Sequence, residues 1–339
     1  MPSVTVIIVT LNRPDCVRRC LECLESQVPR IDQIMVVDAS PDDRTRVVTA
    51  EFDRVTYLRN DNGYGRMTAS RNIGLTRASG EVIVFVDDDA FVHEGWLAAL
   101  LAVYAEHSDA GAVGGRVLNN QPNENAIGVN QIGKLTRWGN LEGWFAADPG
   151  KTLEVDHIMG CNMSFRRATL AELGGFREDY RGISGVREDS DVCLRVRRLR
   201  QKIFLSHNAV VTHIGAPQAI GKRFDARYAY YSARNHMVML IRNFGPLSGV
   251  TVRYLAFSTW STAKEFAWRV GAAVVRAVAF AGGTFMGIVF GLGLFIAKGR
   301  EPRRLDPKGE RVRAALTERD STPMDEAASV SYGISARQL

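Results

Sequence analysis

The stretch VTVIIVT, residues Val4–Thr10, lies at the start of this 339-residue chain and decides its fold. It consists almost entirely of apolar and β-branched residues, without the alternation typical of a strand that has one face in water. Such a run is typical of a central strand that is covered on both faces of its sheet. We therefore expect a buried sheet, with this strand near its centre.

Strands and helices alternate after this first segment. The apolar spacing and the turn residues predict helices over residues 15–26 and 68–78, and strands over residues 33–37, 55–58 and 82–86. Alternation at this spacing is typical of βαβ units. The predicted fold class is therefore α/β, with a Rossmann-like, mainly parallel central sheet that is flanked by helices.

Aspartates follow two of the expected strands. Asp38 closes the second strand, and Asp87, Asp88 and Asp89 follow the fourth, very apolar strand. Ligands of such sheets bind outside the carboxyl ends of the strands. Adjacent carboxylates repel one another unless a cation neutralises them, and Mg²⁺ and Mn²⁺ favour carboxylate oxygens. We expect Asp89 to hold such an ion and Asp87 to bind either a ribose or a water on the ion; a solvated acidic loop is the alternative.

A series of short motifs runs along the chain in a fixed order. They are Thr10 and Asn12 after the first strand, Asp38, residues 69–74 (ASRNIG), residues 86–89 (VDDD), residues 160–167 (GCNMSFRR), residues 174–176 (GGF), residues 187–191 (REDSD) and His213. Each motif is weak alone, but together they resemble the inverting glycosyltransferases of family two, which have the GT-A fold. The resemblance covers residues 4–215.

The resemblance implies a binding site for a nucleotide-diphosphate sugar, with UDP, dTDP and GDP all open as the nucleotide. Asp38 would pair with the nucleobase, Thr10 and Arg13 would line the same pocket, and Mg²⁺ or Mn²⁺ would be the cofactor. Arg71 would contact the donor near its nucleotide. The donor-binding residues that we expect are Thr10, Asn12, Arg13, Asp38, Arg71, Asp87 and Asp88.

Asp189 is implied as the general base, with Glu188 beside it. An acceptor hydroxyl is a poor nucleophile unless its proton is removed as it attacks, and inversion in one displacement needs one such carboxylate. The helix expected over residues 189–199 places Asp189 in its first turn, where the helix dipole keeps a carboxylate ionised. The alternative is that both residues only cap that helix.

Four further residues are expected around the reacting groups. His213 follows the strand-like run 209–212 and either completes the metal shell with Asp87 and Asp89 or is structural. Asn162 is expected on the acceptor side. Trp138 and Trp144 either stack on an acceptor sugar or lipid carrier, or anchor the polar region 119–150, which we expect to form a mobile loop over the site.

The C-terminal part contains an apolar segment. Residues 277–297 are 21 residues without a formal charge, long enough to span a bilayer, and Gly283, Gly287 and Gly291 recur every four residues. Basic residues flank the segment on both sides and give no orientation. We therefore favour a helical hairpin or an in-plane anchor with both flanks in the cytoplasm. A soluble helix packed in an oligomer is the alternative.

The basic charge of the chain is local. Net charge is +6, and residues 298–313 hold seven basic against three acidic residues. This placement after the apolar segment indicates anionic lipid head groups and not nucleic acid. No cleavable signal peptide opens the chain, so we expect the catalytic part at the cytoplasmic face of the membrane. Cys16, Cys20 and Cys23 lack a fourth zinc ligand nearby, and all five cysteines are expected as reduced thiols.

The expected organisation has four parts. Residues 1–117 form the nucleotide-sugar-binding half, residues 118–223 the half with the acceptor site and base, residues 224–298 a helical membrane-associated region, and residues 299–339 a basic, then disordered tail. The function indicated is transfer of a hexose or deoxyhexose to a glycan or lipid-linked acceptor in cell-surface glycan synthesis. The homo-oligomer that we consider would form through the C-terminal helices.

Two other functions are considered. A nucleotidyltransferase would carry a Gly-rich, basic triphosphate loop after the first strand, where this chain has residues 11–14 (LNRP). A membrane adaptor without catalytic activity would have no need of the intact carboxylates.

Overall fold

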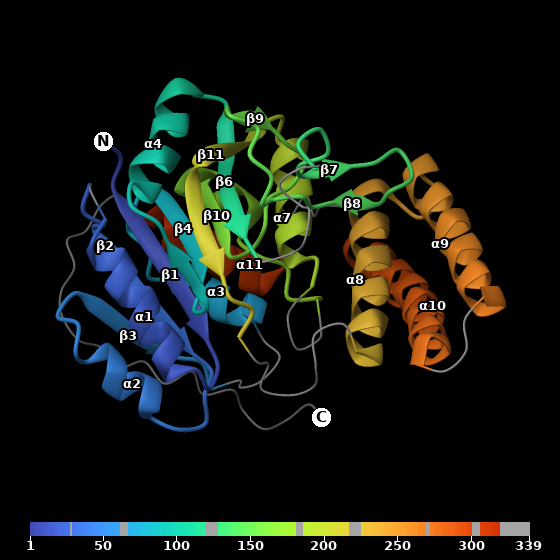
Figure 1. Ribbon diagram of the computed structural model, residues 1–339, viewed down its shortest axis with the longest axis horizontal. Coiled ribbons are helices and arrows are strands. Elements are labelled where there is room, and N and C mark those ends of the chain that lie inside the picture. Colours follow the sequence, from blue (N-terminus) through green and yellow to red (C-terminus); the bar gives the residue numbers. More distant parts are fainter. Residues whose placement is uncertain are drawn as a thin grey trace.

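The computed structural model describes residues 1–27, 29–61, 67–119, 128–180, 186–216, 225–268, 272–299 and 306–318. An α/β domain makes up most of the molecule, and three long helices stand beside it (Figure 1). The sheet of the domain runs through its middle, with helices on both faces. The expected fold class, α/β with a mostly parallel sheet between helices, is thereby confirmed.

The elements have the following bounds. The main sheet contains β1 (Val4–Thr10), β2 (Gln33–Asp38), β3 (Val55–Arg59), β4 (Val82–Asp87), β5 (Ala90–Val92), β6 (Ala110–Leu118), β9 (Leu153–Glu154), β10 (Asn162–Arg166) and β11 (Lys202–His213). A small hairpin is made of β7 (Lys134–Leu135) and β8 (Leu141–Glu142). The helices are α1 (Pro14–Glu25), α2 (Arg44–Thr49), α3 (Met67–Leu75), α4 (Trp96–Glu106), α6 (Arg167–Leu173), α7 (Glu188–Arg198), α8 (Ala226–Phe244), α9 (Gly249–Trp268), α10 (Ala272–Lys298) and α11 (Pro307–Glu318).

The sheet combines a parallel half with a mixed half. Its strand order is β3-β2-β1-β4-β10-β6-β11-β5, with β9 paired to β11. The first four strands in this order are parallel, while β10 runs antiparallel between β4 and β6. Strand β11 begins at Lys202 and is much longer than the run 209–212 that the sequence suggested. Its far end carries His213 back to the edge of the sheet where β4 ends.

The register of β1 brings the predicted acidic residues to one edge of the sheet. Strand β1 lies between β2 and β4, and Ile7 and Ile8 are completely buried, as expected for a central strand. Thr10 pairs with Asp38 on one side, and Val9 pairs with Asp87 on the other. Because parallel strands end at the same edge, both acidic segments lie at the carboxyl ends of the sheet.

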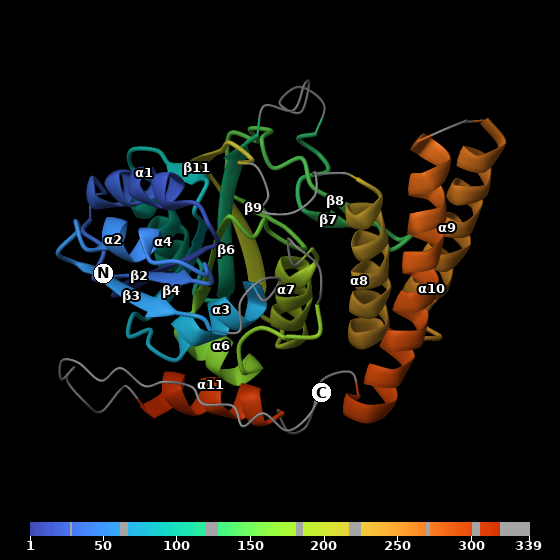
Figure 2. The same ribbon diagram turned by 90° about the horizontal axis from the view of Figure 1, so that it is seen from below.

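Helix α10 packs along α8 through its small residues, and α9 packs beside them (Figure 2). A Cβ added at Gly283 would overlap the carbonyl oxygen of Tyr230, and one at Gly287 would lie 2.5 Å from the carbonyl oxygen of Arg234. The recurring glycines therefore bring the two backbones into close contact, as in helix pairs with small-residue faces. Because α8 covers this face of α10, an oligomer could form only through another face of α10.

Helix α11 returns to the α/β domain, where it lies under α6 and α3 (Figure 2). Its Val312 and Leu316 are buried in the main hydrophobic core, and Arg313 donates hydrogen bonds to two backbone carbonyls of α6. The expected tail from residue 299 thus includes an ordered helix. The residues that we expect to be disordered fall mostly at 319–339, outside the described residues.

Part of the basic charge around α10 and α11 is neutralised within the chain. Lys298 pairs with Asp179 at 3.1 Å, and Lys308 pairs with Glu178. These contacts tie both ends of the segment between α10 and α11 to the α/β domain. The charge that remains for lipid head groups is correspondingly smaller than the sequence indicates.

We predict that Gly283→Ala destabilises the packing of α10 on α8, whereas Gly293→Ala does not. The new methyl group would overlap the backbone of Tyr230 in the first variant, at a cost of about 1–3 kcal/mol. At Gly293 nothing lies within 4 Å, so the higher helix propensity of alanine stabilises by up to about 1 kcal/mol. Urea unfolding in detergent measures both; equal effects of the two substitutions would contradict the packing described.

Candidate active site

A cavity of about 370 Å³ opens at the carboxyl ends of β1 and β4. Residues from both halves of the α/β domain and one residue of α8, Tyr228, line it. The lining includes predicted residues from the first strand to the last: Thr10, Arg13, Arg71, Asp87, Asp88, Asp89, Glu188, Asp189 and His213. The structure therefore brings together nine of the residues that the sequence suggested, from positions as far apart in the chain as Thr10 and His213.

Asp88 anchors the first loop of the site and faces Thr10 and Arg13. The hydroxyl of Thr10 donates to one carboxylate oxygen at 2.7 Å, and Nη1 of Arg13 donates to the other at 2.9 Å. Burial raises the pKa of Asp88 to about 7, although Arg13 and the Thr10 hydroxyl oppose this rise. The same guanidinium lies 3.2 Å from Asp89, so Arg13 is shared by two aspartates.

Asp89 holds the end of β11 in place. Its carboxylate oxygens lie 3.1 Å from Nε2 of His213 and accept a 2.8 Å hydrogen bond from the backbone N–H of Ala216. Burial raises the pKa of Asp89, but the contacts with His213 and Arg13 outweigh burial and leave this pKa below its usual value. Asp89 is therefore an ionised carboxylate that positions the imidazole.

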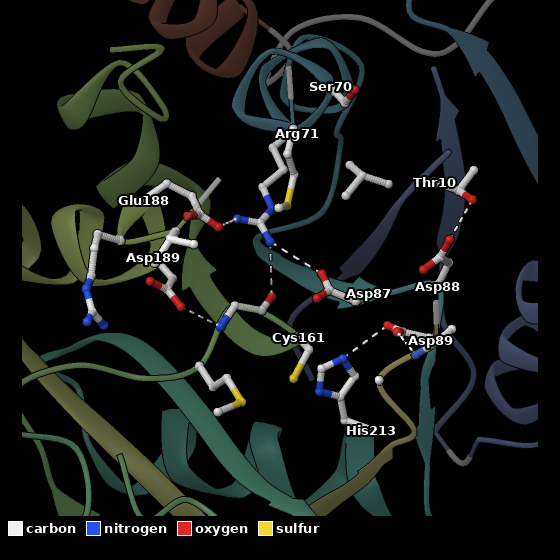
Figure 3. A pocket seen from close by; sticks show the side chains of 18 of the residues that line it. Thr10, Ser70, Arg71, Asp87, Asp88, Asp89, Cys161, Glu188, Asp189 and His213 are labelled. Atoms are coloured by element: carbon white, nitrogen blue, oxygen red, sulfur yellow. Dashed lines mark hydrogen bonds and ion pairs between the residues drawn. The ribbon is translucent and has the colours of Figure 1, made fainter. Parts of the chain in front are cut away.

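Arg71 connects the aspartates of β4 with the acidic pair of α7 (Figure 3). Its guanidinium donates to Glu188 at 2.8 Å, and it lies 3.4 Å from Asp87. The side chain is only 1% exposed and lies over the rings of Phe85 and Phe176. A buried guanidinium needs such partners, because a buried charge without them is strongly unfavourable.

Asp189 points into the cavity from the first turn of α7 (Figure 3). Its oxygens accept hydrogen bonds from the backbone N–H of Gly160 at 3.1 Å and from that of Ser190 at 2.6 Å. These two hydrogen bonds fix the orientation of the Asp189 carboxylate. Glu188 differs, since burial first and the neighbouring Asp189 second raise its pKa to about 8, against the opposing effect of Arg71.

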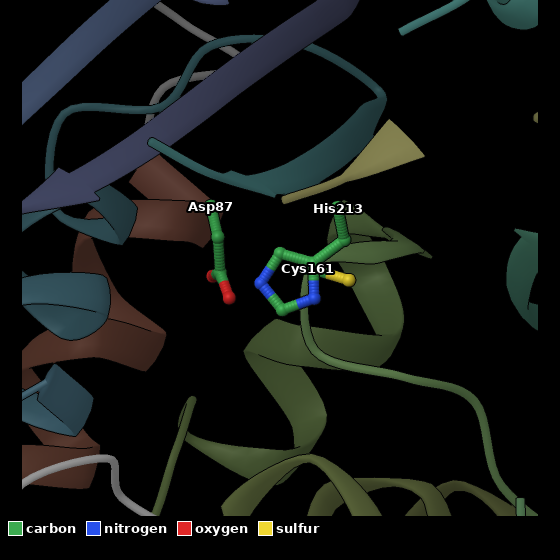
Figure 4. A group of neighbouring side chains, drawn as sticks. All are labelled: Asp87, Cys161 and His213. Carbon is green, nitrogen blue, oxygen red and sulfur yellow. The ribbon is translucent and has the colours of Figure 1, made fainter. Parts of the chain in front are cut away.

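Asp87, Cys161 and His213 offer a set of possible metal ligands (Figure 4). One ligand atom of each lies within 4.8 Å of the others. A carboxylate, an imidazole and a sulfur suit Mn²⁺ better than Mg²⁺, which takes oxygen ligands almost exclusively. The residues present thus fit a divalent cation. Cys161 was not among the predicted ligands; only its place in the motif of residues 160–167 could have indicated it.

Asp89, one of the predicted metal ligands, has other partners in the structure. We expected Asp89 to hold the ion. Its carboxylate instead contacts His213, the backbone N–H of Ala216 and Arg13, so that it acts on the possible metal ligands by orienting His213. All five cysteines are unpaired, as expected.

Asp38 and Asn12 lie beside the cavity and not in its wall. Asp38 is completely buried and accepts hydrogen bonds from Ser40 and from the hydroxyl of Tyr57, at 3.0 Å from the latter. Its neighbour Ala39 lines the cavity. Asn12 is exposed and has a left-handed backbone (φ 57°), and its N–H donates to the Ser40 hydroxyl at 2.8 Å.

The residues expected on the acceptor side have structural contacts. Asn162 is completely buried. Its side-chain carbonyl oxygen accepts a hydrogen bond from the indole N–H of Trp96, and its amide nitrogen donates to the backbone carbonyls of Arg116 on β6 and Ala209 on β11. These bonds leave its amide no free N–H for an acceptor. Trp138 packs near Phe257 of α9, and Trp144 packs against the main core.

Another group of residues completes the wall of the cavity, and none of them was among the predicted site residues. The wall contains Leu141, Gly143, Phe145, His157, Arg187 and Tyr228. Burial first, and Arg187 with it, lower the pKa of His157 to about 4. The imidazole is therefore neutral, and its Nε2–H donates to the carbonyl of Glu142 at 3.1 Å.

Comparison with known proteins identifies related sequences. A family model described as Glycosyl transferase family 2 matches residues 5–174. The glucosyl-dolichyl phosphate glucuronosyltransferase of Haloferax volcanii is 27% identical over 62% of this chain and 68% of its own length. The GalNAc(5)-diNAcBac-PP-undecaprenol beta-1,3-glucosyltransferase of Campylobacter jejuni is 31% identical over 62% of this chain and 63% of its own length. The chain thus spans about two thirds of these relatives.

Solved structures share the fold. The mannosyltransferase PcManGT from Pyrobaculum calidifontis, in complex with GDP-Man and Mn²⁺, superposes with a TM-score of 0.53 at 20% identity and covers 87% of each chain. S. aureus TarS, residues 1–349, superposes with a TM-score of 0.54 at 16% identity and covers 94% of this chain and 88% of its own. The likeness extends over most of the chain.

Proposed function

This chain belongs to glycosyl transferase family 2, and from that premise we propose that it transfers a sugar, with inversion, from a nucleotide-diphosphate donor to a hydroxyl of a lipid-linked acceptor. One observation carries the proposal. A carboxylate held by backbone amides, Asp189, faces the same cavity as the possible cation ligands Asp87, Cys161 and His213.

The cation site supports a metal-dependent reaction. Asp87, Cys161 and His213 would hold Mn²⁺, and the contact between Asp89 and Nε2 of His213 would orient the imidazole. Bound there, the ion supplies positive charge that stabilises the nucleotide diphosphate as it leaves. Mn²⁺ was also present in the structure of the Pyrobaculum calidifontis enzyme, whose fold this chain shares.

Asp189 is the residue that we assign as general base. Its two hydrogen bonds from backbone N–H groups fix its orientation, so that it can take the proton of an acceptor hydroxyl. Glu188 is less suited, because one oxygen binds Arg71 and the other is buried without a hydrogen-bond partner. We therefore assign Glu188 to the positioning of Arg71.

The donor would lie along the carboxyl ends of β1, β2 and β4. Thr10 and Arg13 line the cavity there, and Ala39 continues its wall toward the buried Asp38. Placing the nucleobase near Asp38, as the resemblance implies, agrees with this direction. Arg71 would stabilise the donor only indirectly, since its guanidinium is already paired with Asp87 and Glu188.

A lipid-linked acceptor is supported by the relatives and by the position of the C-terminal helices. The two relatives described above are named for glycans on dolichyl phosphate and undecaprenol diphosphate. In this chain, Tyr228 of α8 forms part of the cavity wall, and α10 packs against α8. An acceptor leaving the cavity past Tyr228 would pass toward those helices.

Helix α10 is suited to the membrane, and the helices before and after the α9–α10 pair both contact the α/β domain. Residues Val274–Lys298 are long and apolar enough to cross a bilayer, and only 22% of the most apolar window is buried. Large apolar side chains face outward along it: Val275, Val278, Phe285, Val289, Phe290 and Ile296. Because α8 and α11 both contact the α/β domain, we propose that α9 and α10 insert as a hairpin or lie in plane at the cytoplasmic face.

We predict that Asp189→Asn abolishes turnover while nucleotide binding is retained. Loss of the base removes proton abstraction and costs about 10²–10⁴-fold in rate, but the cation ligands are unchanged. Asp87→Asn should instead abolish the Mn²⁺-dependent rise in melting temperature that a nucleoside diphosphate causes. Thermal shift and transfer assays over a panel of nucleotide sugars measure both; full turnover in both variants would refute the assigned roles.

We predict that Phe285→Ser weakens binding to vesicles, because its ring, 64% exposed, would lie in the acyl region. Val47→Ser on α2 is the matched control, since Val47 is equally exposed but belongs to the α/β domain. Flotation with anionic vesicles measures the bound fraction of each variant. If Phe285→Ser and Val47→Ser float as the unaltered protein does, α10 is not the membrane contact.

A further inference from the structure

Arg187 has an unusual position in the wall of the active-site cavity. It precedes α7 directly, and its backbone is left-handed, with φ 84° and ψ 0°. Such a conformation is strained for a residue with a side chain and persists only where surrounding structure enforces it. Arg187 lines the cavity in this conformation, two residues before Asp189, the proposed base.

The guanidinium of Arg187 has no counter-ion in the part of the chain that the structure describes. Its Nε is buried without a hydrogen-bond partner, and no carboxylate there lies within ion-pair distance. The nearby Asp189 is bonded to backbone N–H groups instead. By contrast, Arg13 and Arg71, the other arginines of the cavity wall, are each paired with two carboxylates.

Two neutral histidines surround this unpaired charge. Burial and Arg187 lower the pKa of His157 to about 4 and that of His236 to about 3. Nε2–H of His236 donates to the carbonyl of Gly139 at 2.7 Å, and its Nδ1 is buried without a partner. Neither imidazole offers negative charge, so the surroundings leave the charge of Arg187 available to an anion.

The wall at Arg187 lies against α8, because Asn235 of that helix donates a hydrogen bond to the carbonyl of Val186, the preceding residue, at 3.0 Å. The groups that the charge of Arg187 affects are His157, His236 of α8 and Tyr254 of α9, whose ring stacks on His236. A cation held at Asp87 and His213 would neutralise a donor diphosphate there. A donor diphosphate at Asp87 would therefore not be the natural partner of Arg187.

We propose that Arg187 binds the phosphate of a phosphate-linked lipid acceptor, which rests on the acceptor class proposed above. An arginine binds phosphate oxygens through charge-assisted hydrogen bonds, which are strong where water is excluded. The lipid would leave the cavity along Leu141 and Tyr228, toward α8 and α9. The sugar hydroxyl would then lie near Asp189.

The test measures the binding of farnesyl diphosphate by calorimetry to protein whose donor site is saturated with Mn²⁺ and a nucleoside diphosphate. Farnesol serves as the uncharged lipid, and inorganic pyrophosphate serves as the anion without lipid. Arg187→Gln removes the charge, Arg187→Lys keeps it, and Arg187→Gly removes it while relieving the left-handed backbone. Arg200→Gln is the matched control, because Arg200 is an exposed arginine with φ 61°.

We expect farnesyl diphosphate to bind the unaltered protein, the Arg187→Lys variant and the Arg200→Gln control. Arg187→Gln and Arg187→Gly should each weaken this binding at least about ten-fold, with unchanged affinity for nucleoside diphosphate and Mn²⁺. Equal binding in the unaltered protein and Arg187→Gln, or no binding to either, would overturn the proposal. Pyrophosphate binding as tight as that of farnesyl diphosphate would overturn the lipid assignment. Failure of nucleoside diphosphate to bind would instead refute the function proposed above.

Discussion

An excess of negative charge at the end of β4 is the constraint on which the rest of the site depends. Five carboxylates line one cavity: Asp87, Asp88, Asp89, Glu188 and Asp189. Arg13 and Arg71 pair with four of them, and the backbone amides bind the fifth. Among the described arginines of the cavity wall, only Arg13 and Arg71 pair with these carboxylates, so we propose that a cation at Asp87 and His213 stabilises the fold and the donor together.

The same charges set the arrangement of the two halves of the domain. Arg71 on α3 joins β4 to α7 through Asp87 and Glu188, and His213 on β11 joins the other edge through Asp89. The cavity wall is then completed by Tyr228 of α8, against which α10 packs with its glycines. The residues of the cavity and the C-terminal helices are thus parts of one packed structure, and α11 packs against α6 and α3 of the α/β domain.

Features that depend on a regular pattern of apolar residues, or on motifs in a fixed order, could be predicted from the sequence. The apolar run of β1 and the aspartates after β4 predicted the sheet, its buried centre and the edge that carries the site. Contacts between distant segments were not predictable in this way. Asn162 lies in a motif, yet its amide binds Trp96 and two carbonyls, because those strands meet only in the folded chain. Cys161 and Arg187 likewise owe their positions to tertiary packing.

The central claim is that one divalent cation binds at Asp87 and His213 together with a nucleoside diphosphate. The direct measurement is a titration with Mn²⁺, in which loss of the free-ion electron paramagnetic resonance signal reports binding. With a nucleoside diphosphate present, the account predicts one tightly bound ion per chain, and none in the variant that combines Asp87→Ala with His213→Ala. Undiminished binding of Mn²⁺ by that variant would contradict the account.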